Sequence, residues 1–220
     1  AKDDDNAVSN EAEIAITVEE VNDAPGGPSI TGPSAGSIFR GDGSGVPNGI
    51  VHLTWTPGED EETAETDLRY EIQVAYEGIT YEDVVTTDAG AIEYYFMCPD
   101  YRNSSNFRFR VRTLDDDSVD PKYSEWAYSP VYILDNQAPE AKVVQNQDVF
   151  VNQDIEFELK ITDPAPGNSG LSHVNAPAGA VLVAGDLLTG VFRYIVTVNG
   201  TYKFNLTDKA GNVGFVEVEV

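Results

Sequence analysis

The chain has 220 residues, of which 38 are acidic and 13 are basic, so its formal net charge is −25 at pH 7. This charge excludes nucleic acid and an anionic membrane surface as partners, because binding to either needs basic side chains to neutralise phosphates. A hydrophobic content of 41% and 11 tyrosines exclude a disordered acidic tail and predict packed domains. The length allows two domains of about 100 residues each.

The use of cysteine in this chain indicates where the protein is located. Cys98 is the single cysteine, so the sequence predicts no intrachain disulfide and no thiolate metal site. Secreted vertebrate domains of this size often carry disulfides, so we expect a bacterial or archaeal surface protein. No run approaches the roughly 20 apolar residues of a membrane span, the 220 residues contain no signal peptide, and the chain opens on Ala1-Lys2 instead of methionine. We expect an excised segment of a longer protein.

Residues 1–27 are too short for a domain. Ile14, Ile16 and Val18 alternate on one face of a single predicted strand, which should be frayed unless it pairs with a neighbour. The sequence Val-Asn-Asp-Ala-Pro follows at residues 21–25. This ending resembles that of cadherin-like repeats of bacterial surface proteins. The resemblance implies that residues 1–27 are the last strand and linker of a preceding module.

Residues 28–137 show three runs in which apolar and polar residues alternate, at residues 51–55, 68–74 and 107–112. Clusters of Gly, Pro, Asp, Asn and Ser separate them. Several short strands at this spacing predict a β-sandwich, with Trp55 in its core. Cys98 is expected to be a small buried side chain.

Four motifs fall in order along this region: Leu-Thr-Trp at 53–55, Tyr-x-Ile-x-Val at 70–74, Phe-x-Phe-Arg-Val at 107–111 and Ser-Glu-Trp at 124–126. Their order resembles a fibronectin type III domain. Phe107 stands where that family usually has a tyrosine, so the corner hydrogen bond of that tyrosine is not expected here.

Residues 138–220 alternate over 154–161, 191–196 and 215–220, which predicts further strands. Asn199-Gly200 predicts a two-residue hairpin between the runs before and after it. The Thr-Asp at 162–163, the Asn-Gly-Thr-Tyr at 199–202 and the Asp-Lys-Ala-Gly-Asn at 208–212 resemble Ig-like domains of bacterial cell-surface proteins. The resemblance places Tyr202 at the corner of such a sandwich. The predicted fold is therefore all-β, with tandem antiparallel β-sandwiches, fibronectin type III-like followed by Ig-like, end to end.

Catalysis is not expected. His52 and His173 are the two histidines and lie in different predicted modules, and the common nucleophile, phosphate-loop and zinc motifs do not occur. Paired carboxylates would also suit a glycosidase, but here they sit in loops of small sandwiches without an obvious concave site.

Three arginines, Arg108, Arg110 and Arg112, line one face of a predicted strand. They could contact an anion or a glycan, or they could pair with Glu71 across strands and stack on Trp126, which is the favoured interpretation. The Tyr-Ser-Glu-Trp-Ala at 123–127 is similar to the Trp-Ser-x-Trp-Ser element of cytokine receptors, where such a ladder forms.

Acidic and amide residues gather at two joins, each ending in Ala-Pro: the first join at residues 21–25 and the second join at 135–139. A proline after a strand ends the ladder, and sandwich topology brings two acidic loops to each join. Calcium favours such oxygen ligands, although ordinary solvated loops are the alternative. The candidate calcium ligands are Asn22, Asp23, Asp60, Glu61, Asp115, Asp116 and Asp117 at the first join, and Asp135, Asn136, Asp163 and Asp208 at the second.

The expected function is a non-catalytic stalk or adhesion module of an extracellular or cell-surface protein. Its expected partners are another extracellular protein or a glycan, and neighbouring domains of the same chain. No nucleic acid and no direct membrane insertion are expected. The alternative is a carbohydrate-binding or spacer module of a large secreted polysaccharide-active enzyme, which an exposed aromatic platform in a groove would favour.

Overall fold

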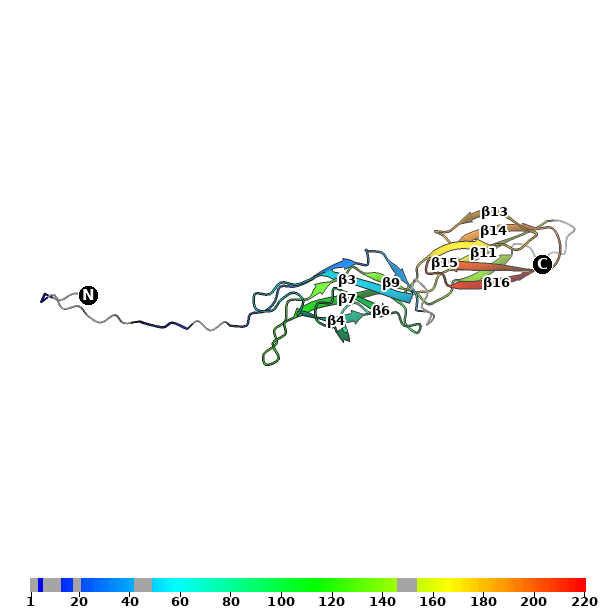
Figure 1. The fold of residues 1–220 in the computed structure, drawn as a ribbon. Coiled ribbons are helices and arrows are strands. Elements are labelled where there is room, and N and C mark those ends of the chain that lie inside the picture. The colour runs from blue at the N-terminus through cyan, green and yellow to red at the C-terminus, as the bar shows by residue number, and fades with distance from the viewer. Residues whose placement is uncertain (1–3, 6–12, 18–20, 42–48, 146–153) are drawn as a thin grey trace.

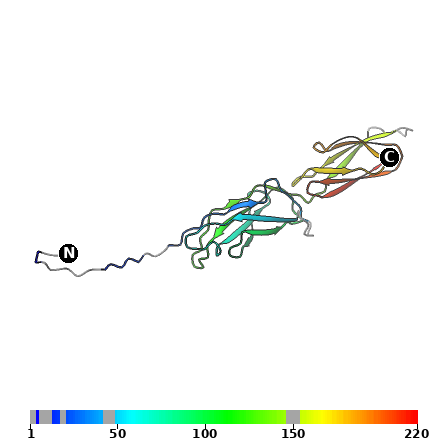
Figure 2. The ribbon, with the colours of Figure 1, turned by 45° about the horizontal axis from the view of Figure 1, so that its top comes forward.

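The structure is a computed structural model that describes residues 4–5, 13–17, 21–41, 49–145 and 154–220. The ordered elements of these residues are β-strands, and they form two sandwiches arranged end to end (Figure 1, Figure 2). The fold is therefore all-β with tandem sandwiches, as the sequence predicts. Within the described ranges, no helix is long and apolar enough to cross a membrane.

The first sandwich is built from two sheets. One sheet has the order β1-β3-β6, and the other has the order β2-β9-β7-β4-β5, with β8 pairing to β7. All neighbouring strands are antiparallel except β2 and β9, which are parallel. The strands are β1 (Ser29–Gly32), β2 (Ile38–Phe39), β3 (Ile50–Thr56), β4 (Arg69–Ala75), β5 (Glu82–Thr86), β6 (Glu93–Met97), β7 (Ser104–Leu114), β8 (Ala127–Tyr128) and β9 (Tyr132–Leu134).

Alternation along the strands builds the first core. On β3, every second side chain points inward, and Trp55 packs on Tyr70 of β4 with ring centroids 5.3 Å apart. On β7, Phe107 and Phe109 are fully buried, with ring centroids 5.1 Å apart. Cys98 is buried in the same core, as expected. Period-two patterning suits a sheet with one face in the core and one in solvent, which is why these strands could be predicted.

The second sandwich pairs a sheet of order β10-β11-β14-β13 with a sheet of order β12-β15-β16. Its aromatic core includes Phe157, Tyr194 and Phe204. The rings of Tyr194 and Phe204 lie 4.7 Å apart. The strands are β10 (Glu140–Gln145), β11 (Ile155–Thr162), β12 (Leu171–Asn175), β13 (Ala180–Asp186), β14 (Val191–Val196), β15 (Thr201–Asp208) and β16 (Val213–Glu219).

The hairpin predicted at Asn199-Gly200 is wrong. A hairpin would make β14 and β15 neighbours in one sheet, but β14 pairs with β11 and β13, whereas β15 pairs with β12 and β16. The turn favoured by Asn-Gly needs a positive φ at both central residues, and Gly200 does not have one. Instead the segment crosses between sheets, held by paired backbone hydrogen bonds between Gly200 and Val220.

The described part of the predicted N-terminal strand, residues 13–17, forms no strand, and Ile14 and Ile16 are 83% and 81% exposed. This agrees with a strand that frays without a neighbour. Val18 lies outside the described residues. The domain limits 1–27, 28–137 and 138–220 stay a prediction.

Candidate metal centre at the second join

Three aspartates from separate strand ends meet where the two sandwiches join. Asp135 directly follows β9, the last strand of the first sandwich. Asp163 directly follows β11, and Asp208 is the last residue of β15, both in the second sandwich. One carboxylate oxygen of each lies within 4.8 Å of the others. The sequence names all three as candidate ligands, and sandwich topology brings them together across 73 residues of chain, from Asp135 to Asp208.

Two of the three carboxylates are almost completely buried. Asp135 is 0% exposed and Asp208 is 1% exposed. Asp135 accepts hydrogen bonds from the backbone N–H groups of Gln137 at 3.0 Å and Ser169 at 2.9 Å. Asp208 accepts hydrogen bonds from the backbone N–H and the side-chain Nδ2 of Asn212, both at 2.9 Å. These donors orient the carboxylates and offset part of their desolvation.

The carboxylate of Asp163 has a hydrogen-bond partner for one of its two oxygens. Its Oδ2 accepts a 2.6 Å hydrogen bond from the backbone N–H of Gly170, but its Oδ1 is buried and has no hydrogen-bond partner. Burial, followed by the negative charges of Asp135 and Asp208, raises the pKa of Asp163 to about 6. Burial is also the main cause that raises the pKa of Asp208. Close, desolvated carboxylates favour a proton or a cation among them.

The donor set fits a hard cation. Calcium binds oxygen ligands at about 2.4 Å, so oxygens that share one ion are separated by at most about 4.8 Å. The separations at the second join meet this limit. The orphaned Oδ1 of Asp163 supplies an oxygen that is desolvated and free to coordinate. Asp135, Asp163 and Asp208 would therefore hold the ion.

Asn136, the fourth candidate at this join, faces the first sandwich. Its Nδ2 donates to the carbonyl oxygens of Pro99 at 3.0 Å and Arg102 at 2.6 Å. Its backbone N–H donates to Oδ1 of Asn103 at 2.6 Å. The contacts described for Asn136 therefore fasten the linker to the first sandwich.

Further contacts tie the sandwiches to each other directly. The N–H of Gly167 donates to Oγ of Ser105 at 2.9 Å, and Nη1 of Arg40 donates to the carbonyl of Gly211 at 2.5 Å. Gly167 has a φ of +92°, a conformation that favours glycine at this close approach. The second join is thus a packed interface.

Asn212 is a residue that the sequence reasoning did not identify as part of the site. Besides its contacts with Asp208, its Nδ2 donates to the backbone carbonyl of Asp135 at 3.0 Å. One side chain therefore links the linker of one sandwich to a strand end of the other. Its position four residues after Asp208, within the Asp-Lys-Ala-Gly-Asn element, is the signal that could have found it.

The first join is organised differently. Nδ2 of Asn22 donates to Oδ2 of Asp115 at 2.9 Å and lies 3.5 Å from Oδ2 of Asp117. Oγ1 of Thr63 donates to Oδ1 of Asp116 at 3.2 Å and so links the two acidic loops. The predicted convergence of Asn22 with the loop 115–117 is present, and here an amide donor sits between the carboxylates.

The remaining first-join candidates lie at its rim. Asp23 and Glu61 are exposed, and Asp60 caps its own loop by accepting from the N–H of Thr63 at 3.1 Å. Hydrogen bonds from the backbone N–H groups of Val119 and Asp120 lower the pKa of Asp117. Among the described residues, the acidic group compact enough to share one ion is that of the second join.

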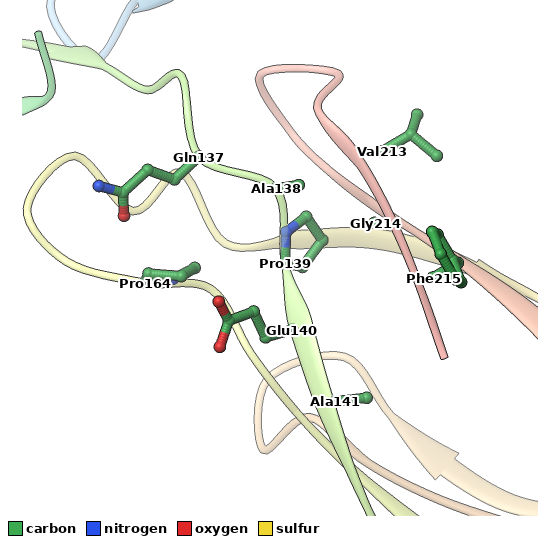
Figure 3. Close-up of a pocket in the computed structure, with 9 residues that line it drawn as sticks. All are labelled: Gln137, Ala138, Pro139, Glu140, Ala141, Pro164, Val213, Gly214 and Phe215. Atoms are coloured by element: carbon green, nitrogen blue, oxygen red, sulfur yellow. The ribbon is translucent and has the colours of Figure 1, made fainter. Parts of the chain in front are cut away.

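A cavity of about 780 Å³ opens beside the second join, between the linker and β16 (Figure 3). Gly214 brings the β16 backbone against the linker there, and a Cβ at this position would overlap the carbonyl of Pro139. Most of the lining is apolar, and it is formed by Gln137, Ala138, Pro139, Glu140, Ala141, Pro164, Val213, Gly214 and Phe215.

The arginines on one face of β7 contact side chains of their own sandwich. The guanidinium groups of Arg110 and Arg112 lie 4.2 Å and 4.5 Å from the ring of Trp126. Arg112 also forms a 2.6 Å ion pair with Glu71, and Arg110 donates to Gln73 at 2.7 Å. The interpretation as cross-strand pairing and stacking is confirmed for Arg110 and Arg112, whereas the guanidinium of Arg108 lies 5.9 Å from the ring of Tyr81.

The two histidines belong to separate surfaces. Nε2 of His52 lies 2.8 Å from Glu93, and the His52 ring stacks on Tyr95 with centroids 4.4 Å apart. His173 lies on β12 of the other sandwich, where Nδ1 is 3.4 Å from Oγ of Ser172. The two rings therefore do not form one catalytic pair.

Comparison with known proteins gives remote similarities. No family model and no curated protein matches the sequence. Among solved structures, a marsupial T cell receptor is similar, with 11% identity over 93% of this chain and a TM-score of 0.35. The FN1–FN3 domains of chicken CNTN1 are similar over 90% of this chain and 67% of that chain, with 12% identity and a TM-score of 0.35. This chain spans 63% of the length of the T cell receptor chain.

Proposed function

We propose that this chain is a non-catalytic stalk or adhesion segment of an extracellular or cell-surface protein, stiffened at its second join by a bound divalent cation, calcium. The observation that carries the proposal is the cluster of Asp135, Asp163 and Asp208 between the two sandwiches. Three carboxylates this close repel one another, and a cation relieves that repulsion while linking ligands from both sandwiches.

The shape of the chain supports a spacer role. Two sandwiches with separate cores lie end to end (Figure 1). A cation bound by the linker residue Asp135 and by two residues of the second sandwich opposes bending at the joint. The partners of such a segment are neighbouring domains of its own chain and an extracellular protein or glycan. The single cysteine supports a bacterial or archaeal surface as its location.

Calcium binding is tested by thermal unfolding in calcium and in excess chelator, with titration calorimetry. A ligand that binds the folded state alone stabilises it by about 2.7 kcal/mol at a hundredfold excess over its dissociation constant. We expect calcium to raise the melting temperature of the second sandwich and to release or absorb measurable heat. Coincident melting temperatures together with no calorimetric signal would overturn the calcium site.

Two variants locate the ion. Asp163→Asn removes the carboxylate that has an orphaned oxygen, so calcium should no longer raise the melting temperature. Asp88→Asn removes one charge at an exposed turn and is the matched control, which should keep the full response to calcium. An equal loss in both variants would indicate general charge screening instead of a site at the second join.

The alternative, a carbohydrate-binding module, finds weaker support. Tyr95 is 57% exposed and stacks on His52, so an aromatic surface exists on the outer face of β3 and β6. It does not line the cavity at the second join. A flat aromatic pair on a strand face offers less enclosure than the grooves that bind sugars. Glycan-array binding that Tyr95→Ala abolishes would favour this alternative.

A further inference from the structure

The strand β13 is an edge with one described neighbour. It closes the order β10-β11-β14-β13 and pairs with β14 on one side. Its other side therefore presents backbone N–H and C=O groups that no described strand occupies. Figure 1 shows it at the margin of the second sandwich. An open edge of this kind is a template for another strand.

This edge is unusually apolar for a surface strand. Val181 is 62% exposed, and Leu182 and Val183 are exposed as well, as are Leu187 and Leu188 in the turn that follows β13. Proteins commonly protect open edges with lysine, proline or inward-pointing charge. Within β13 the charged residue is Asp186, at the last position. Exposed aliphatic side chains in a row along an open edge mark an interaction surface.

The charge pattern of the chain singles out the same surface. Residues 164–185 contain no Asp, Glu, Lys or Arg, and this is the longest uncharged stretch in a chain of net charge −25. Two copies of such a chain repel each other over most of their surfaces. Contact between copies is least opposed where this neutral stretch ends in an exposed edge.

The sequence of the strand is also self-complementary. Residues 180–184 read Ala-Val-Leu-Val-Ala in both directions. When two copies pair antiparallel about a two-fold axis at Leu182, Ala180 lies opposite Ala184, Val181 lies opposite Val183, and the two Leu182 side chains meet. A two-fold interface requires a surface that complements itself in this way.

We propose that two copies of this chain associate through their β13 edges, which pair antiparallel with Leu182 on the two-fold axis. The β10-β11-β14-β13 sheets of both copies then form one continuous sheet. This goes beyond the stalk role and does not depend on calcium, because β13 carries none of the three clustered aspartates.

One irregularity sets the extent of the contact. β13 contains an extra residue between Leu182 and Ala184 relative to β14. This extra residue, Val183, lies inside the segment 180–184, so the free edge must straighten there to pair in the register centred on Leu182, and the contact extends no further than these five residues. An interface of this size lies below the standard total of about 1,600 Å², so we expect a dissociation constant in the micromolar range. Because the same edge is used in both copies, association stops at two.

Sedimentation velocity of the calcium-free chain, from about 1 µM to about 500 µM, tests the dimer. The wild type should shift from monomer to dimer, and Val181→Lys should weaken the dimer at least tenfold. Val213→Lys is the matched control: Val213 is 63% exposed on β16, an edge strand of the other sheet, and its substitution should leave the dimer unchanged. A monomer at every concentration, or equal weakening by both variants, overturns the proposal.

Cysteine cross-linking tests the register. Leu182→Cys should form a covalent dimer under mild oxidation, because the two-fold axis places these positions opposite each other. Val181→Cys alone should cross-link poorly but should cross-link when mixed with Val183→Cys, since diagonal positions are about 7–8 Å apart and a disulfide needs Cβ atoms within about 4.5 Å. Equal cross-linking by Val213→Cys would overturn the β13 register.

Discussion

At the scale of single residues, Tyr202 fixes a corner of the second sandwich with one hydroxyl group. The sequence places Tyr202 at such a corner by resemblance, and its hydroxyl donates to the carbonyl of Val198 at 2.7 Å. The chain between β14 and β15 is thereby held as it crosses from one sheet to the other. Phe107, in contrast, has no hydroxyl, and its ring packs entirely into the first core.

We predict that Tyr202→Phe lowers the free energy of unfolding by about 0.5–1.5 kcal/mol, the usual net contribution of one hydrogen bond. Urea unfolding of the second sandwich measures it. Tyr95→Phe, which removes a hydroxyl from an exposed ring, is the control and should change stability little. Equal effects in both variants would show that the corner contact contributes nothing specific.

Asp163 leads to a prediction on pH. In the metal-free protein its pKa is about 6, above the ordinary value of 3.8, so the folded state holds more protons than the unfolded state between these values. Protonation therefore stabilises the fold. In excess chelator, the contribution of this group should raise the melting temperature of the second sandwich as pH falls from 7 to 5. Asp163→Asn should lack this contribution, so its pH response should be smaller than that of the wild type.

Saturating calcium provides the counter-experiment. Protons and calcium compete for the same carboxylate oxygens, so acidification should then lower the melting temperature instead of raising it. An identical pH response with calcium and with chelator would contradict cation binding by Asp163.

At the scale of strands, the sequence predicted those with one buried and one solvated face. β3, β4, β11 and β14 alternate cleanly, and each was predicted to within one residue of its observed limits. For β7 the prediction covers 107–112, the middle of a strand that runs from Ser104 to Leu114. β2, β8 and β9 are two or three residues long and carry too few positions for a period to be recognised. In β13, apolar residues occupy both faces, so no alternation marks it.

Asn199-Gly200 shows how tertiary context overrides a local signal. Two aromatic residues of β15, Tyr202 and Phe204, belong to the core of the second sandwich. The requirement that β15 pair with β12 and β16 places it in the sheet opposite β14. Packing of the two sheets therefore outweighs the hairpin preference of a dipeptide.

The close approach of β16 to the linker gives a prediction at the same scale. A methyl group at Gly214 would overlap the carbonyl oxygen of Pro139, so β16 or the linker must move. We expect Gly214→Ala to destabilise the second sandwich by about 1–3 kcal/mol. Gly200→Ala is the matched control: no atom lies within 4 Å of its added Cβ and its φ is not positive, so it should be neutral or stabilising by about 0.4–1 kcal/mol. Chemical denaturation of both variants measures the difference.

At the scale of the whole molecule, part of the candidate site could be predicted from the sequence. Asp135, Asp163 and Asp208 could be grouped because each follows or ends an apolar strand, and strand ends of a sandwich meet at its poles. The separation of roles at the two joins could not be predicted. It depends on side-chain hydrogen bonds: Asn22 donates from its amide to Asp115, and Asn136 donates from its amide to backbone carbonyls of the first sandwich.

The end-to-end arrangement predicts the scattering behaviour. A compact globule of 220 residues would have a radius of gyration of about 17 Å. Two sandwiches in line should give a clearly larger value in small-angle scattering of the dilute, monomeric chain, with a pair-distance distribution that has a long tail. A radius near 17 Å would mean that the sandwiches fold back on each other in solution.

The parallel pairing of β2 and β9 has a mechanical consequence. These strands lie near the beginning and at the end of the first sandwich, and they are held by hydrogen bonds from the N–H of Ile133 to Ser37 and from the N–H of Asp135 to Phe39. A pull along the long axis draws the two strands past each other, so these bonds are loaded in shear and must break together instead of opening in sequence. The second of these bonds belongs to Asp135. Tension carried through the chain therefore passes through the residue whose carboxylate lies in the acidic cluster, and an ion held there would reinforce the point of greatest load.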